Sequence, residues 1–206
     1  MHYKIRLCAV FILTGMISVS LCAEDLNHNV LPYKKKLKEK ILEGSIFSES
    51  RVKSSTFGEN KIQELNFSIA GLHEKSCTYA LKTLSLYEGY SKFIDFVKES
   101  TYDEKTEMIN FKLSHTLLPY DMRLIFKLPR INKTGKYNFV FDEGILKNLK
   151  GTINVINHEN RCLFYSKADW KGPTTGFPDL IFEFFSQTLA KMTMEKLFRI
   201  SSTLSH

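Results

Sequence analysis

The sequence lacks the short motifs that mark most catalytic and cofactor sites. It holds no glycine-rich phosphate loop, no H-E-x-x-H, no G-x-S-x-G and no C-x-x-C. Those absences remove the motif-based case for nucleotide hydrolases, zinc proteases, α/β hydrolases and thiol redox enzymes. The histidines are scattered, and no two stand four residues apart as they would on one helix face. We therefore predict no catalytic residues, no metal site and no cofactor.

Cysteine is also scarce. The chain has four cysteines, and Cys8 and Cys22 fall in a hydrophobic N-terminal segment. The remaining two, Cys77 and Cys162, are too few and too far apart in sequence for a zinc site. They could pair as an intramolecular disulfide in an oxidising compartment, or they could be two small buried hydrophobic residues. The sequence leaves both outcomes open.

Strong charge patterning is missing as well. The formal net charge is +7, but no arginine-rich or aromatic-basic motif accompanies it, which argues against nucleic acid as a partner. Much of the excess lies in a lysine run between Lys34 and Lys40. Such a run is typical of a solvated face or a polar leader. The alternative is a weak contact with anionic membranes through lipid headgroups.

The first 23 residues have the layout of a signal peptide. Lys4 and Arg6 precede an apolar stretch at residues 7–21, and small residues surround Cys22 and Ala23, where we expect cleavage. The apolar stretch is short for a membrane span. Lipidation at Cys22 and an uncleaved anchor are the alternatives to a protein that is exported and then periplasmic or secreted. We divide the chain into a signal peptide at 1–23, a basic leader at 24–45, one domain at 46–200 and a tail at 201–206.

What the sequence does contain is aromatic residues and alternating strands. Its 16 Phe and 9 Tyr favour a β-rich or cavity-lined fold over a helical bundle. Leu65, Phe67 and Ile69 alternate with smaller or polar residues, which is the period-two pattern of a strand with one buried face. Similar patterns recur along the chain. We predict strands at residues 46–55, 61–72, 98–103, 107–115, 121–128, 136–142, 149–157 and 161–168.

Two short helices and one long helix complete the prediction. Ser76 is a suitable N-cap for the first short helix, and the second is expected at residues 90–97, after Gly89. Pro178 and Asp179 stand where a helix start favours them, so the long helix should run from 177 to about 200. Spacings of three and four predict one wide apolar face on it. That face consists of Phe177, Ile181, Phe184, Phe185, Thr188, Leu189 and Met192.

The order of these elements resembles the START-like, Bet v 1-type helix-grip superfamily (SRPBCC). The likeness covers residues 61–200 and includes the short-helix segment LSLYEGYSKFI at 84–94. An extra strand at 46–55 is similar to what exported bacterial members show. The resemblance implies an α+β fold with a curved antiparallel sheet around the C-terminal helix. It implies function less sharply, because the superfamily holds lipid carriers, hormone receptors, cyclases and oxygenase domains.

The resemblance also implies a hydrophobic cavity between the sheet and the helix. The same residue types could fill a dry core, since side-chain volumes and strand register decide between the two. Arg123 has the geometry to bind a ligand carboxylate or phosphate, but a solvent-facing arginine would show the same alternation. Tyr165 and Trp170 could form the rim of a mouth or pack under the helix. The candidate ligand-binding residues are Phe111, Leu113, His115, Arg123, Phe126, Phe139, Phe141, Tyr165, Trp170, Ile181, Phe184, Phe185 and Met192.

We therefore expect a protein that holds a lipid or another hydrophobic small molecule and catalyses no reaction. Two alternatives predict a different interior. An envelope interaction module would have a filled core and would work through its lysine-rich leader. An enzyme of the cyclase or aromatase kind would bring four polar residues together inside the cavity, namely His115, Arg123, Tyr165 and Asp169.

Overall fold

The computed structural model describes residues 31–203, except 117 and 119 and the side chain of residue 57. The predicted signal peptide lies outside the described residues. Element bounds follow in chain order. They are α2 (Lys35–Leu42), β1 (Phe47–Phe57), β2 (Asn60–His73), α3 (Cys77–Leu84), the 3-10 helix η1 (Tyr87–Lys92), β3 (Val97–Asp103), β4 (Met108–Leu113), β5 (Met122–Lys127), β6 (Gly135–Glu143), β7 (Lys150–His158), β8 (Arg161–Pro173) and α4 (Asp179–Thr203).

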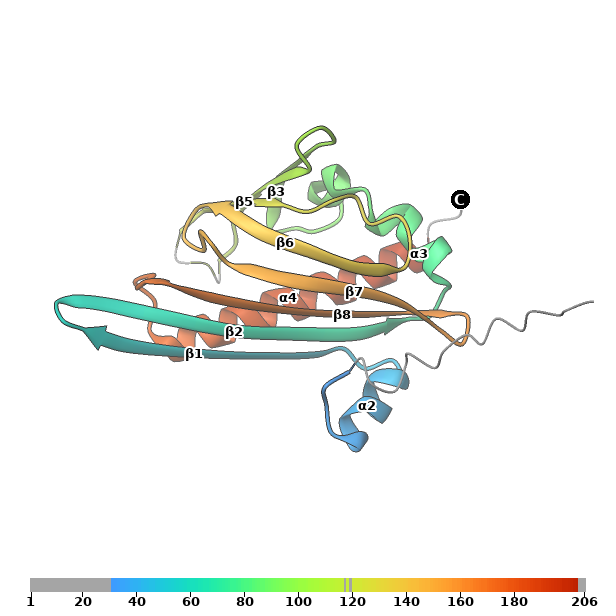
Figure 1. The fold of residues 1–206 in the computed structure, drawn as a ribbon. Helices are drawn as coiled ribbons and strands as arrows, with labels where there is room; N and C mark the ends of the chain where they lie inside the picture. Colours follow the sequence, from blue (N-terminus) through green and yellow to red (C-terminus); the bar gives the residue numbers. More distant parts are fainter. Residues whose placement is uncertain (1–30, 117, 119, 204–206) are drawn as a thin grey trace, which may run out of the picture.

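The strands form one antiparallel sheet in the order β1-β2-β8-β7-β6-β5-β4-β3. All eight predicted strands are present, and β8 continues to Pro173, beyond its predicted end. The sheet curves around α4, which runs along its concave side (Figure 1). This arrangement confirms the predicted α+β class and the helix-grip architecture. None of the described helices is long and apolar enough to span a membrane.

The helix α4 is fastened to β1, the first edge strand of the sheet. The Val52 amide donates to the Glu183 carboxylate (2.6 Å), and the Ser54 amide donates to the Asp179 carboxylate (2.8 Å). The Gln187 amide group donates to a β1 carbonyl (3.1 Å). Edge strands carry unpaired backbone groups that attract other strands. Side chains of α4 therefore complete the hydrogen bonding of β1 and hold the helix against that edge.

The rotation of α4 about its axis differs from the predicted one. Ile181, Phe184 and Met192 belong to the predicted apolar face, yet they lie on the outer side and are 44%, 54% and 39% exposed. Phe182 and Leu197 are buried in their place. The prediction of one inward face with this composition is corrected accordingly.

The cause of this rotation is a polar stripe on a helix that is apolar nearly all round. When apolar residues occupy most sides of a helix, their spacing does not select the buried side. Asp179, Glu183 and Gln187 stand four residues apart and so share one side of the helix. Their hydrogen bonds to β1 orient that side toward the sheet edge, and this leaves part of the apolar surface outside.

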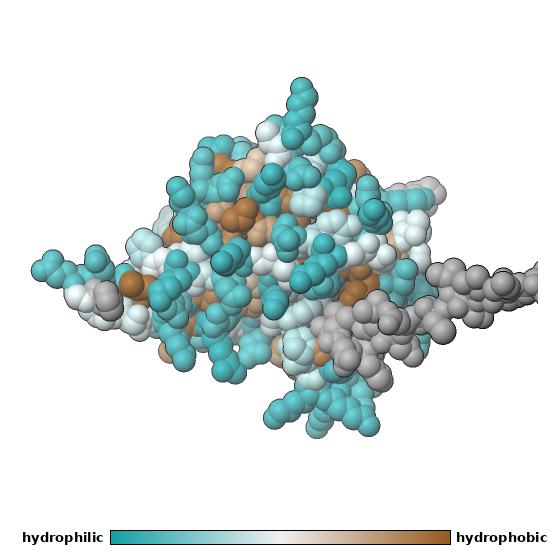
Figure 2. Space-filling model, in the orientation of Figure 1, coloured by the Kyte–Doolittle hydropathy of each residue, from teal (hydrophilic) through white to brown (hydrophobic). Residues whose placement is uncertain are grey.

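The convex face of the sheet carries the described part of the predicted basic leader. Ile41 of α2 is fully buried, and Leu31 packs in the same cluster as Leu163 of β8. The Tyr33 ring meets the Tyr165 ring edge to face at 6.0 Å. Figure 2 shows that this side of the molecule is otherwise largely hydrophilic. The segment is thus a docked helix with its lysines outward.

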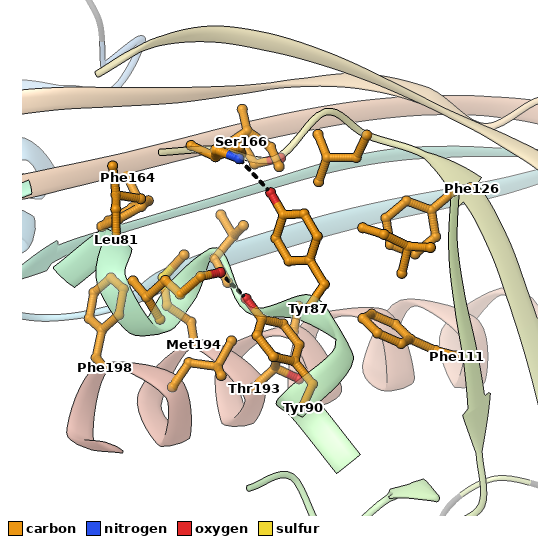
Figure 3. A pocket seen from close by; sticks show the side chains of 18 of the residues that line it. Leu81, Tyr87, Tyr90, Phe111, Phe126, Phe164, Ser166, Thr193, Met194 and Phe198 are labelled. Carbon is orange, nitrogen blue, oxygen red and sulfur yellow. Dashed lines mark hydrogen bonds between the residues drawn. The ribbon is translucent and has the colours of Figure 1, made fainter. Parts of the chain in front are cut away.

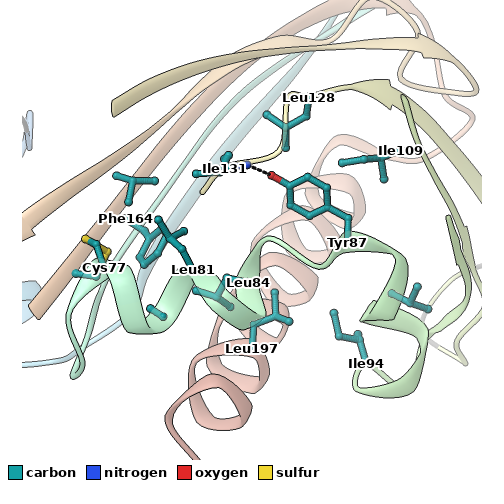
Figure 4. Packing of buried hydrophobic residues seen from close by; sticks show 14 of the residues in the cluster. Cys77, Leu81, Leu84, Tyr87, Ile94, Ile109, Leu128, Ile131, Phe164 and Leu197 are labelled. Carbon is teal, nitrogen blue, oxygen red and sulfur yellow. Dashed lines mark hydrogen bonds between the residues drawn. A yellow bond between two sulfur atoms is a disulfide. The ribbon is translucent and has the colours of Figure 1, made fainter. Parts of the chain in front are cut away.

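The short helices lie at one end of the concave side. The Ser76 hydroxyl accepts a hydrogen bond from the Tyr79 amide, which confirms it as the N-cap of α3. Cys77 and Cys162 form a disulfide that joins α3 to β8 (Figure 4). The second predicted short helix is present as the 3-10 helix η1, but it spans Tyr87–Lys92 and not the predicted residues 90–97. Val97, its predicted last residue, already pairs with β4 as the first residue of β3.

Candidate ligand-binding cavity

Two adjoining chambers lie between the concave face of the sheet and α4. The C-terminal chamber, of about 320 Å³, lies beside the C-terminal half of α4 and is also walled by α3 and η1 (Figure 3). The N-terminal chamber, of about 300 Å³, lies beside the first half of α4. Both are in contact with the same five side chains, so the two chambers adjoin, and together they are called the elongated cavity. The shared residues are Tyr90, Phe111, Phe126, Ala190 and Thr193.

Aromatic rings form the constriction between the chambers. The Tyr90 ring stacks on the Phe111 ring with centroids 5.7 Å apart, and the Phe111 ring meets Phe126 edge to face at 5.6 Å. Phe126 in turn stacks on Phe141 at 4.7 Å. Contacts of this kind favour defined ring orientations. The strands β4, β5 and β6 therefore present a continuous aromatic wall to the cavity.

The strand register explains why these rings share one wall. Phe126 is the cross-strand partner of both Ile109 and Phe141, and directly opposed residues in an antiparallel sheet point to the same side. The alternation seen in the sequence thus becomes a row of inward side chains across neighbouring strands. Outward residues of the same strands, such as Lys112 and Arg123, form the opposite row.

None of the described residues that line the two chambers is charged. Tyr87 donates a hydrogen bond to the Pro129 carbonyl (3.1 Å), and Tyr90 donates to the Leu84 carbonyl (2.6 Å). Burial raises the pKa of both tyrosines far above the usual range, because an apolar surrounding disfavours the charged phenolate. The phenols therefore stay neutral, and the cavity is apolar with a few hydroxyl groups.

Some of the predicted site residues meet in this cavity. Phe111 and Phe126 line both chambers, and Leu113, Phe141 and Phe185 line the N-terminal chamber. They come from three strands and from α4, so the fold unites residues that are far apart in sequence. For the strand residues among them, inward alternation was a sufficient signal.

Other predicted aromatic residues lie beside the cavity or behind it. Trp170 donates to the Lys147 carbonyl (3.0 Å) and packs edge to face on Phe182. Tyr165 contributes to the C-terminal chamber wall, but its ring packs against Tyr33 on the convex side. Phe139 lies next to Phe141 in the adjoining hydrophobic cluster.

The polar candidates do not converge. The Arg123 side chain is exposed and donates to the Asn110 side chain (3.0 Å). His115 contacts Phe96 edge to face and lines neither chamber. Asp169 accepts a hydrogen bond from Asn66 at the sheet surface (2.9 Å). The four residues that the enzyme hypothesis requires therefore do not meet inside the cavity.

Sequence reasoning missed the helical wall of the cavity. Leu81 and Leu84 of α3, Tyr87 of η1 and Met194 of α4 all line the C-terminal chamber. The candidate ligand-binding residues predicted from the sequence include none from the segment that forms α3 and η1. Its density of Leu and Tyr was a usable signal, because two short helices with large apolar residues need a hydrophobic surface to cover.

A serine–histidine pair lies near the end of α4 and has a structural role. His73 Nδ1 accepts a hydrogen bond from the Lys75 amide (3.0 Å), so its proton resides on Nε2, which faces Ser201 Oγ at 2.9 Å. Ser201 is fully buried and donates to the Leu197 carbonyl. Burial lowers the pKa of His73. This histidine acts as a donor to the serine and does not serve as its base. No cluster of potential metal ligands occurs among the described residues.

Comparisons with known proteins agree with the geometry. No protein-family model matches the chain, and no curated protein matches it. The Zhui aromatase/cyclase from Streptomyces sp. R1128 matches with a TM-score of 0.57 at 6% identity, over 68% of this chain and 94% of that one. A conserved protein from Geobacillus kaustophilus matches with 0.56 at 13% identity, over 68% and 97%. Ara h 8.0201 matches with 0.50 at 10% identity, over 78% and 100%.

Identities this low carry information on the fold alone. The matches cover nearly the whole of each solved structure, so the shared unit is complete in this chain. The protein therefore has the helix-grip fold that the order of its elements predicted.

Proposed function

We propose that this protein binds a lipid or another hydrophobic small molecule in the elongated cavity. The observation that carries the proposal is a cavity of two adjoining chambers with no charged side chain among the described residues of its walls. Pockets for small molecules commonly have volumes of about 300–1,000 Å³ and mostly apolar walls. An apolar ligand that enters such a space removes apolar surface from water, which favours binding.

The direct test uses diphenylhexatriene, a hydrocarbon whose fluorescence rises when it leaves water. We expect saturable binding to the purified wild-type protein. Ala190→Trp should weaken it by at least about tenfold, because Ala190 borders both chambers and the added indole fills the space that a ligand needs.

Met192→Trp is the matched control, since it adds the same side chain to the outer side of the same helix. Its affinity for diphenylhexatriene should equal that of the wild type. Circular dichroism and thermal unfolding establish that both variants are folded. Equal binding by the wild type and Ala190→Trp would exclude the cavity as the binding site.

The natural ligand is accessible by native mass spectrometry of protein purified from its own host. We expect an added mass that organic extraction removes and releases as a defined compound. Preparations that stay empty and gain no mass with added hydrophobic compounds would favour the interaction-module hypothesis. The open chambers argue against the filled core on which that hypothesis depends.

The cyclase or aromatase alternative receives less support. The likeness to an aromatase/cyclase concerns the fold, and the residues nominated for catalysis do not meet inside the cavity. Arg123 and Asp169 make hydrogen bonds at the surface, and the Tyr165 ring packs against Tyr33. The proposal therefore assigns the cavity a binding role and no chemical step.

We further propose that the protein is exported. The layout of residues 1–23 supports this, and so does the disulfide between Cys77 and Cys162, since such bonds persist in oxidising compartments. Intact mass measured on protein from host fractions tests the proposal. A mature N-terminus after Cys22 or Ala23 is expected, whereas full-length protein with free thiols in the cytosol would contradict export. A diacylglyceryl mass on Cys22 would identify a lipoprotein.

The lysine run supports a weak contact with anionic membranes. Lys34, Lys35, Lys36 and Lys40 are exposed on or beside α2. Deleting the segment would also remove the buried Ile41, so the cleaner variant replaces these four lysines with glutamate. Co-sedimentation with phosphatidylglycerol vesicles should fall in this variant and with added salt. Unchanged co-sedimentation would remove the lysines from the proposal.

A further inference from the structure

The hydroxyl groups on the cavity walls are not equivalent. Those of Tyr87, Tyr90 and Thr193 all donate to backbone carbonyl groups of the protein. The Ser186 hydroxyl likewise donates to a carbonyl of its own helix. Each of these protons is therefore already engaged before a ligand arrives, and none of these groups needs a ligand to complete its hydrogen bonding.

Ser166 differs from them. It lies in β8, opposite Ile69 of β2 and Ile153 of β7, and all three residues line the C-terminal chamber. Figure 3 shows it on the sheet side of this chamber, across from Thr193 and Met194 of α4. Among the described residues, its hydroxyl has no hydrogen-bond partner. A donor and acceptor between two isoleucines is thus left for a molecule in the cavity.

The absence of charge from the walls restricts what that molecule can be. A carboxylate or phosphate inside the chambers would lose its hydration and would meet no Lys, Arg or His side chain among the described wall residues. Burying such a group without a counter-charge is strongly unfavourable. A single hydroxyl or carbonyl group, in contrast, can pair with Ser166 and so offset the loss of its hydration.

We infer that the cavity selects an uncharged ligand with one hydroxyl or carbonyl group, which Ser166 binds in the C-terminal chamber. The apolar body of the ligand then passes the constriction at Tyr90, Phe111 and Phe126 and enters the N-terminal chamber. This inference rests on the proposed function, because it requires that the cavity be the binding site. It adds the class of ligand and its direction in the cavity.

The test measures displacement of diphenylhexatriene by dodecanol, dodecanone and dodecanoate at mildly alkaline pH. The alcohol and the ketone should displace the probe, and dodecanoate should need at least about a tenfold higher concentration. Ser166→Ala should weaken dodecanol about fivefold, the effect of one neutral hydrogen bond. It should leave diphenylhexatriene, which has no polar group, unaffected. Ser55→Ala, on an exposed position of β1, is the control and should change neither affinity.

The outcomes separate the two proposals. Failure of diphenylhexatriene to bind the wild type would overturn the proposed function itself. Binding of the probe without displacement by dodecanol would overturn the inference alone. So would equal displacement by dodecanol and dodecanoate, or an alcohol affinity that Ser166→Ala leaves unchanged.

Discussion

The two sides of the sheet relate to α4 in different ways. At the β1 edge, formed by β1 and β2, the helix packs closely and its polar side chains bind the strand backbone. On the opposite side, formed by β3 to β6, inward residues such as Phe111 and Phe126 face the cavity. The helix is therefore held along one side and stands off from the other.

This difference separates the residues that secure the helix from those that line the cavity. Hydrogen bonds at the β1 edge position α4 without using the apolar side chains of β3 to β6. A helix held only by apolar packing would bury those side chains and close the space. Edge attachment thus keeps the cavity open, and the two sides should respond differently to substitution.

The disulfide should give the largest effect, since it ties the helical wall of the cavity to β8. Replacing both Cys77 and Cys162 with Ala should lower the free energy of unfolding by about 4 kcal/mol, because the bond closes a long loop. Its sequence separation is 85 residues. Urea unfolding of the double variant measures this loss. Mass spectrometry should first verify that the disulfide is formed in the wild type. If the double variant then has the same urea midpoint as the wild type, the disulfide does not stabilise the protein as predicted.

The β1 edge should show the next largest effect, through Gln63. Its fully buried side chain donates to the Asp179 carboxylate (2.8 Å) and accepts from the Thr175 hydroxyl (2.6 Å). Gln63→Ala leaves these groups without a partner and should lower the free energy of unfolding by about 2–3 kcal/mol. The exposed Lys53→Ala should change it by less than about 0.5 kcal/mol. Similar losses of unfolding free energy in Gln63→Ala and Lys53→Ala would show that Gln63 does not anchor α4 at the β1 edge.

The cavity side should tolerate truncation better. Phe111→Ala should lower the free energy of unfolding by about 1–2 kcal/mol, below the 3–5 kcal/mol that is typical of a fully packed Phe, because one side of its ring already borders the cavity. Binding of diphenylhexatriene should weaken in the same variant. Arg123→Ala, on the outer row of the same sheet, should alter neither quantity. A loss as large as that of Gln63→Ala would mean that both sides are equally packed.

The smallest effect concerns pH. Hydrogen bonds from Ser54 and Gln63 hold the pKa of Asp179 below its ordinary value of 3.8. The stabilisation is therefore complete above about pH 5 and is lost as the pH falls through 3.8 and below. It should stay below about 1 kcal/mol because this carboxylate lies near solvent. As the pH is lowered, the urea midpoint of Asp179→Asn should fall less steeply than that of the wild type. Parallel plots of midpoint against pH for the two proteins would contradict this prediction.

Much of the fold was predictable because short sequence patterns determine which residues form strands and where helices begin. The alternation of Leu65, Phe67 and Ile69 correctly predicted a strand, and Ser76 correctly predicted a helix start. The bounds of the second short helix were predicted wrongly, because its end depends on a distant strand. Its last predicted residue, Val97, pairs with Leu113 across the sheet, and pairing with a distant strand overrides a local helical pattern.

The candidate site was predictable only in part. Inward alternation identified Phe111, Leu113 and Phe126, since a strand has just two faces. It did not identify Tyr87 and Ala190, because helices turn their residues in every direction and contacts elsewhere choose the rotation.

The sequence by itself determined the strands, the long closing helix and the presence of two cysteines outside the N-terminal segment. Only the tertiary structure decided which side of α4 faces inward and whether the interior is open. Both outcomes depend on where Asp179, Glu183 and Gln187 meet β1. The contact between α4 and β1 joins residues that are more than a hundred positions apart in the sequence, so no local sequence pattern predicts it.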